Sequence, residues 1–135
     1  AGFFVVSAGK HVRKYAEKWK AEGDFLKSHA IQSLALETAE GFAERLHQLM
    51  RDDQDISDPI DMTMKDRFAA KYTGQRFSFG YPACPNLEDQ EKLFRLLKPE
   101  DVGIQLTEGC MMDPEASVSA MVFAHPQARY FNVER

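Results

Sequence analysis

Two cysteines and four histidines are the side chains in this sequence that could act as nucleophiles or general bases, and they are scattered along the chain. They are Cys84, Cys110, His11, His29, His47 and His125. A catalytic nucleophile needs an adjacent base or a lowered pKa, and a zinc site needs three or four close ligands. The spacing of the two cysteines fits neither a C-x-x-C redox motif nor a zinc motif. The sequence therefore indicates a binding module without catalytic residues of its own, and it predicts no metal site.

The most distinctive stretch is residues 76–85, which combine a cation, three aromatic rings, a glycine and two prolines. Gly80 can adopt backbone conformations closed to other residues, and each proline fixes φ and removes a donor. We expect an ordered loop that aims its side chains. Arg76 and Tyr81, presented in this way, suit a ligand with a carboxylate and a flat ring, because guanidinium groups fork onto carboxylates and aromatic faces stack on heterocycles. The alternative is a rigid surface connection whose aromatic rings pack into the core.

A long helix before this loop is the strongest secondary-structure signal. Asp24 is placed to cap it, and apolar residues recur every three or four positions up to Met50. The predicted inward face is Ile31, Leu34, Ala35, Thr38, Phe42, Leu46 and Met50, and the predicted water-facing residues are Glu37, Glu44, Arg45 and Gln48. Glu40 falls close to the buried edge. Gly41 lowers helix stability by about 1 kcal/mol relative to alanine in a helix interior. It either allows another element to approach the helix closely or is a tolerated surface glycine.

The other predicted elements are short. We expect strands at residues 3–7, 104–107, 117–124 and 130–133, and helices at residues 12–23, 63–71 and 87–97. The strand at 117–124 is apolar on both faces and is expected to be central. The five aspartates of residues 52–61 lack the glycine and glutamate of a calcium loop, so we expect a solvated loop. The predicted fold class is α+β, with a twisted, mostly antiparallel sheet of these four strands and the long and shorter helices packed on it.

The composition is that of one globular domain. The chain has 135 residues, of which 44% are hydrophobic and 28% charged, and this length is sufficient for a single core. A formal net charge of −4 argues against a nucleic-acid module, which would present a basic face to phosphates. No apolar run approaches the ~20 residues that span a bilayer. Two cysteines do not make a disulfide framework, so we expect a cytoplasmic protein.

Several motifs of this sequence resemble those of a known family and occur in the same order along the chain. Residues 76–85 read R-x-x-x-G-Y-P-A-C-P, the signature of the activation (reactivation) domain of cobalamin-dependent methionine synthase. Further stretches match in the same order: residues 39–44, 106–108 and 116–119, and Phe123-x-His125-Pro126 leading to Tyr130. The loop is the specific part of this resemblance, which covers nearly the whole chain. Family domains also have an upstream segment, so we expect residues 1–135 to be a single activation-like domain without its N-terminal segment.

This resemblance implies that the chain binds S-adenosylmethionine. By the family's pattern, Arg76 holds the methionine carboxylate, and the backbones of Ser78 and Gly80 contact the ligand. Tyr81 and Tyr130 help to enclose the nucleoside, and Glu40 lies near the site. The residue types agree with these roles. The guanidinium of Arg76 is always charged and can bind a carboxylate through two N–H groups, and the rings of Tyr81 and Tyr130 can stack on adenine.

The implied function is the reactivation of oxidised cobalamin by reductive methylation. A partner domain of methionine synthase holds the cobalamin, flavodoxin or an equivalent reductase supplies an electron, and the methyl group passes from S-adenosylmethionine to cobalt. The sulfonium is already an activated methyl donor, so the task of the chain is placement, and the methyltransferase is the parent enzyme. One alternative is a truncated or degenerate domain that acts as a non-catalytic interaction module. Another is a thiol enzyme that uses Cys84, which would require a low thiol pKa.

Overall fold

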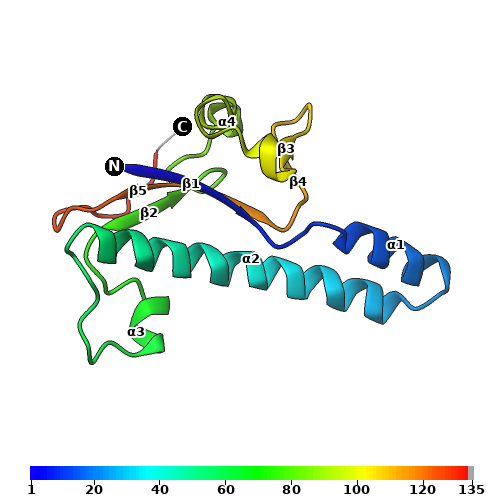
Figure 1. The fold of residues 1–135 in the computed structure, drawn as a ribbon, viewed down its shortest axis with the longest axis horizontal. Helices are drawn as coiled ribbons and strands as arrows, with labels where there is room; N and C mark the ends of the chain where they lie inside the picture. The colour runs from blue at the N-terminus through cyan, green and yellow to red at the C-terminus, as the bar shows by residue number, and fades with distance from the viewer. Residues whose placement is uncertain (134–135) are drawn as a thin grey trace.

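The computed structural model describes residues 1–133, in which a long helix lies along one face of a small sheet (Figure 1). In chain order the elements are β1 (Gly2–Ser7), α1 (Val12–Ala21), α2 (Phe25–Asp53), α3 (Met64–Phe68), β2 (Gln75–Ser78), the 3-10 turn η1 (Leu87–Asp89), α4 (Gln90–Leu97), the 3-10 turn η2 (Pro99–Val102), β3 (Gln105–Leu106), β4 (Met112–Asp113) and β5 (Ser117–Phe123). This arrangement is α+β, as predicted.

The main sheet is antiparallel throughout and has the strand order β1-β5-β2. The strand β5 is central, as its two apolar faces predicted. Its Ala120 pairs with Phe4 of β1 and with Ser78 of β2. The third strand, β2, is the start of the stretch that was predicted to be a loop, and that part of the prediction is wrong.

Two predicted strands do not join this sheet. Gln105–Leu106 pairs with Met112–Asp113 in a separate two-stranded sheet. Residues 130–133 are irregular, and the backbone N–H of Val133 donates to the carbonyl of Pro82 at 3.0 Å. Strand pairing depends on contacts that are distant in sequence, so a short apolar run does not reveal its partner.

The helix α2 packs on the sheet through small residues. Its buried alanines, Ala35, Ala39 and Ala43, contact a core formed by Phe4, Val6, Ala116, Val118, Ala120 and Val122. Leu34 and Phe42, which were predicted to face inward, are 67% and 50% exposed. The predicted face was rotated because large side chains dominate an apolar pattern, whereas alanines allow the helix to approach the sheet closely. A Cβ placed on Gly41 would meet no atom within 4 Å outside the helix, so this glycine admits no other element.

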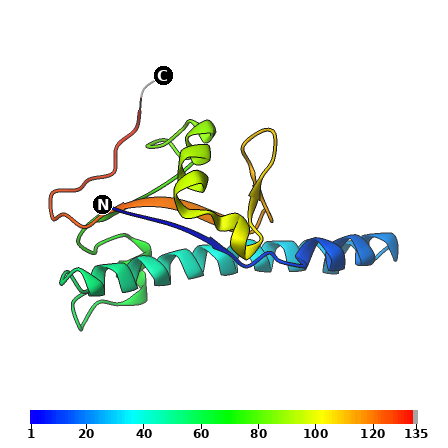
Figure 2. The ribbon, with the colours of Figure 1, turned by 45° about the horizontal axis from the view of Figure 1, so that its top comes forward.

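The predicted cap at Asp24 is confirmed, and two further helical starts are capped in the same way. The side chains of Asp24, Thr63 and Asn86 accept hydrogen bonds from backbone N–H groups at the starts of α2, α3 and η1. The helix α4 covers the sheet face opposite α2 (Figure 2). Across that interface the Ser119 hydroxyl donates to Gln90 at 2.7 Å. The sheet is therefore covered by helices on both faces. No helix within residues 1–133 has both the length and the apolar character needed to cross a bilayer.

Candidate functional site

Arg76 lies in β2 and extends its side chain toward α2. Its Nη2 is 3.5 Å from Oε2 of Glu40 and 3.8 Å from Oε2 of Glu44. The side chain is 18% exposed, and its Nη1 is buried without a hydrogen-bond partner among the described residues. A buried N–H group without an acceptor is costly. The arginine therefore contacts helix carboxylates through one nitrogen and has a second donor that an anionic ligand could satisfy.

Glu40 and Glu44 lie one helical turn apart on the side of α2 that faces Arg76. The side chain of Glu40 is 47% exposed. The side chain of Glu44 is only 20% exposed, and its Oε1 is buried without a partner in the described part of the chain. The prediction that Glu44 faces water is wrong, because the buried stripe of α2 follows the alanines and brings this residue against β2.

An ion pair is buried near the C-terminal end of α2. Arg51, near the end of α2, binds Asp58 through two nitrogens, with Nε–Oδ1 at 2.9 Å and Nη2–Oδ2 at 3.0 Å. The side chains of Arg51 and Asp58 are 1% and 2% exposed. Arg67 also donates to Oδ2 of Asp58, at 3.1 Å. The prediction of a wholly solvated acidic loop is therefore wrong for Asp58, because alternating aspartates do not show which of them has a cationic partner.

Tyr72 contacts both Arg51 of the ion pair and Glu44, and His47 packs against it. The guanidinium of Arg51 lies 3.8 Å from the centroid of the Tyr72 ring, and the His47 ring meets Tyr72 edge-on with centroids 5.1 Å apart. Burial, with the nearby charges of Arg51 and Arg76, lowers the pKa of His47 to about 3. Burial, with the charge of Glu44, raises the pKa of Tyr72 to about 12. Both rings are therefore uncharged at neutral pH.

We call these side chains together the charged cluster. Its members are Glu40, Glu44, His47, Arg51, Asp58, Arg67, Tyr72 and Arg76. Sequence reasoning missed most of them, although a signal was present. His47 and Arg51 continue the four-residue steps of Ala35, Ala39 and Ala43, so extending the alanine stripe would have placed both polar side chains inside.

The loop after β2 is held by its own backbone. Gly80 has φ 86°, and its N–H donates to the carbonyl of Cys84 at 2.8 Å. The N–H of Cys84 donates to the carbonyl of Tyr81, also at 2.8 Å. A side chain at Gly80 would be strained at this φ, and its Cβ would approach Leu87 to 3.0 Å. From Gly80 onward the chain therefore forms the ordered loop that the sequence predicted.

The aromatic residues lie beside this loop. Phe77 follows Arg76 in β2 and so points to the other face of the sheet. Its ring stacks on Tyr130, with centroids 5.8 Å apart and planes at 15°. Tyr81 and Tyr130 are 54% and 46% exposed.

The structure thus brings together some of the expected site residues and not others. Arg76 contacts Glu40 directly, and Ser78 and Gly80 continue the same strand and loop. Tyr130 stacks on Phe77, on the sheet face opposite Arg76, and the hydrogen bond from Val133 ties the segment that follows it to the loop. Tyr81 is exposed on the loop, and no contact joins it to Arg76 or Glu40.

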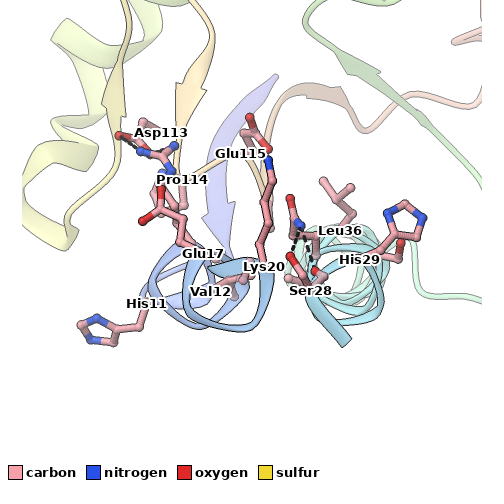
Figure 3. A pocket seen from close by; sticks show the side chains of 17 residues that line it. His11, Val12, Glu17, Lys20, Ser28, His29, Leu36, Asp113, Pro114 and Glu115 are labelled. Atoms are coloured by element: carbon pink, nitrogen blue, oxygen red, sulfur yellow. Dashed lines mark hydrogen bonds and ion pairs between the residues drawn. The ribbon is translucent and has the colours of Figure 1, made fainter. Parts of the chain in front are cut away.

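Two of the hollows in the described chain can be compared with the positions of the expected site residues. One, of about 310 Å³, is lined by Phe77, Phe123, His125, Gln127, Ala128, Arg129 and Phe131, and it adjoins the aromatic stack. The other, of about 500 Å³, lies between α1, α2 and the turn before β5 (Figure 3). At its rim Arg13 pairs with Asp113 at 2.8 Å. The lining of this larger hollow includes none of the six expected site residues.

The cysteines do not have the surroundings of reactive thiols. Burial, with the charge of Asp89, raises the pKa of the Cys84 thiol. Burial also raises the pKa of Cys110, with further contributions from acidic neighbours that include Glu91. A thiol nucleophile needs a lowered pKa, so the surroundings of these two thiols do not support the thiol-enzyme alternative. Within residues 1–133 no three His, Cys, Asp or Glu side chains are grouped to hold a metal ion.

Comparisons with known proteins agree on one family. The family model of the vitamin B12 dependent methionine synthase activation domain matches residues 1–135. The methionine synthases of Mycobacterium tuberculosis and Mycobacterium leprae are 34% and 39% identical to this chain over 137 aligned positions. These alignments cover 97% of this chain but only 12% and 11% of the two proteins.

A solved structure supports the same assignment. The crystal structure of the MetH reactivation domain bound to AdoHcy matches with a TM-score of 0.88 and 30% identity. The match covers 96% of this chain and 41% of that chain. The chain therefore spans a small part of the length of its full-length relatives. It belongs to the family of activation domains of vitamin B12-dependent methionine synthase.

Proposed function

We propose that this chain binds S-adenosylmethionine for the reactivation of cobalamin in a methionine synthase. The observation that carries the proposal is the buried Nη1 of Arg76, which has no partner in the described chain and lies beside the G-Y-P-A-C-P loop. A ligand carboxylate would satisfy this donor. The solved relative binds AdoHcy, a ligand with the same amino-acid tail as S-adenosylmethionine, and this supports the assignment.

Each expected site residue has a role in this proposal. Arg76 binds the carboxylate of the ligand, and Glu40 provides negative charge near its cationic groups. The backbones of Ser78 and Gly80 contact the ligand along the strand and loop. The exposed rings of Tyr81 and Tyr130 enclose the nucleoside.

The chain places the ligand and performs no acid–base chemistry. Bound S-adenosylmethionine supplies an activated methyl group, and the protein holds that group in position for transfer. Another domain of the longer enzyme would hold the cobalamin, and flavodoxin or an equivalent reductase would supply the electron. We assign the methyltransferase activity to the longer enzyme and place the protein in the cytoplasm.

Calorimetric titration with S-adenosylmethionine tests the proposal through Arg76→Ala. Because loss of one partner leaves a desolvated charge unpaired, we expect the substitution to weaken binding by about 2–5 kcal/mol. Arg45→Ala removes an exposed arginine from α2 and should leave the affinity unchanged. Equal affinity of Arg76→Ala and the wild-type chain would overturn the proposal. An absence of binding heat with the wild-type chain would favour the alternative of a non-catalytic interaction module.

A further inference from the structure

We propose that Glu44 is a positioning residue that orients Arg76 for its ligand, and that Tyr72 and the Arg51–Asp58 ion pair hold Glu44 in place. This inference rests on the proposed function of Arg76. It assigns a role to a part of the charged cluster that does not itself contact the ligand.

The first step is the contact between Glu44 and Arg76. Both carboxylates near Arg76 approach the same nitrogen, Nη2, and leave Nη1 without a partner. The side chain of Glu40 is 47% exposed and is free to change rotamer in solvent, whereas Glu44 is 20% exposed. Glu44 is therefore the more constrained of the two contacts. It restrains the guanidinium through Nη2 and keeps Nη1 for the carboxylate of the ligand.

The second step is the contact between Tyr72 and Glu44. The Tyr72 hydroxyl donates to Oε2 of Glu44 at 3.5 Å, and Arg76 approaches this same oxygen. The tyrosine keeps its proton at neutral pH because burial raises its pKa to about 12. One carboxylate oxygen of Glu44 thus has a neutral donor and a cation as neighbours, and these two contacts restrict the rotamers of its side chain.

The third step is the support of the Tyr72 ring. The guanidinium of Arg51 covers one ring face at 3.8 Å, and Asp58 holds Arg51 through two hydrogen bonds. Asp58 also accepts a hydrogen bond from Arg67 of α3. The connection between α2 and β2 is therefore held to the end of α2 through Asp58. An arginine that is already oriented loses less conformational entropy when its ligand binds.

NMR of the ligand-free chain tests the first step independently of binding. In Glu44→Gln, which keeps the shape of the side chain and removes its charge, we expect a lower order parameter for the Nε–Hε bond of Arg76. Glu37→Gln, an exposed substitution on the same helix, should leave it unchanged. Thermal unfolding followed by circular dichroism checks that each variant is folded. An unchanged Arg76 order parameter in folded Glu44→Gln would overturn the inference.

A binding cycle then separates orientation from other effects. We expect Glu44→Gln to weaken S-adenosylmethionine binding about tenfold, and Tyr72→Phe to weaken it about threefold. Glu44→Asp, which keeps the charge, should recover part of the loss. In an Arg76→Met background, Glu44→Gln should have no further effect, because the arginine that it orients is gone.

The outcomes distinguish this inference from the proposed function. If Arg76→Met abolishes binding but Glu44→Gln has no effect, the inference fails and the proposed function stands. If Glu44→Gln weakens binding equally with and without Arg76, Glu44 acts on the ligand or on the fold and the inference also fails. If neither substitution changes the affinity for S-adenosylmethionine, the proposed function fails.

Discussion

The two halves of the inner face of α2 are built on different principles. From Ala35 to Ala43 the helix presents alanines to an apolar sheet. From Glu44 to Arg51 it buries acidic, imidazole and guanidinium groups beside β2 and near α3 (Figure 1). The first half stabilises the fold by close packing and removal of apolar surface from water. Burying the charged groups of the second half carries a desolvation cost that their partners must offset. This half also contacts Arg76 of β2, the arginine that we propose binds the ligand.

The alanine half of α2 builds the domain, whereas the charged half contains the residues that we propose orient the side chain of Arg76. Apolar substitutions are tolerated best when volume is conserved, so the alanine half is sensitive to added atoms. A buried ion pair is sensitive to loss of one partner, because the remaining charge is then unpaired. The two halves should therefore respond differently to substitution and to pH.

The largest effect is expected from Asp58→Asn in the charged half. This substitution leaves Arg51 and Arg67 without their shared carboxylate, and breaking a buried pair of this kind costs about 3–5 kcal/mol. Urea unfolding followed by circular dichroism measures the loss. Asp61→Asn, at an exposed position in the same loop, should change the free energy of unfolding by less than about 0.5 kcal/mol. Equal effects of the two substitutions would show that the ion pair does not contribute to stability.

A smaller effect is expected from Ala43→Leu in the alanine half. Ala43 is 0% exposed, so a larger side chain must displace the sheet or adopt a strained rotamer, at a cost of about 1–3 kcal/mol. Ala30→Leu adds the same atoms at an exposed position of α2 and serves as the control in the same unfolding measurement. A fully stable Ala43→Leu variant would contradict the close approach of helix and sheet.

A third difference concerns the pH dependence of stability that His47 contributes. Its pKa is lowered from 6.5 to about 3, so between these values the unfolded chain binds a proton that the folded chain does not. Stability therefore rises with pH, by up to about 1.4 kcal/mol per pH unit, and this contribution is complete above pH 6.5. His47→Gln should flatten the unfolding free energy between pH 4.5 and 6.5. An unchanged slope would mean that the imidazole is protonated in the folded state.

Local patterns were sufficient to predict several elements. The three- and four-residue steps and the Asp24 cap predicted a long second helix, and the structure has it at Phe25–Asp53. The largely apolar character of both faces of residues 117–124 predicted a central strand, which is β5. The motif beginning at Arg76 predicted the family. Each of these features is encoded by neighbouring residues.

Features that depend on distant partners could not be predicted in this way. Asp58 is one of five aspartates in its segment, and only the folded chain shows that Arg51 and Arg67 surround it. Likewise, β2 is a strand because β5 pairs with it, and residues 130–133 lie against the loop instead of extending the sheet. Tertiary contacts of this kind override local propensity.

The central claim is that Arg76 recognises the carboxylate of the ligand, and a comparison of two ligands tests it most directly. Calorimetric titration of the wild-type chain would compare S-adenosylmethionine with its decarboxylated form. We expect decarboxylation to weaken binding at least about tenfold, and we expect the two ligands to bind Arg76→Met with equal affinity. Equal affinity of both ligands for the wild-type chain would contradict the account.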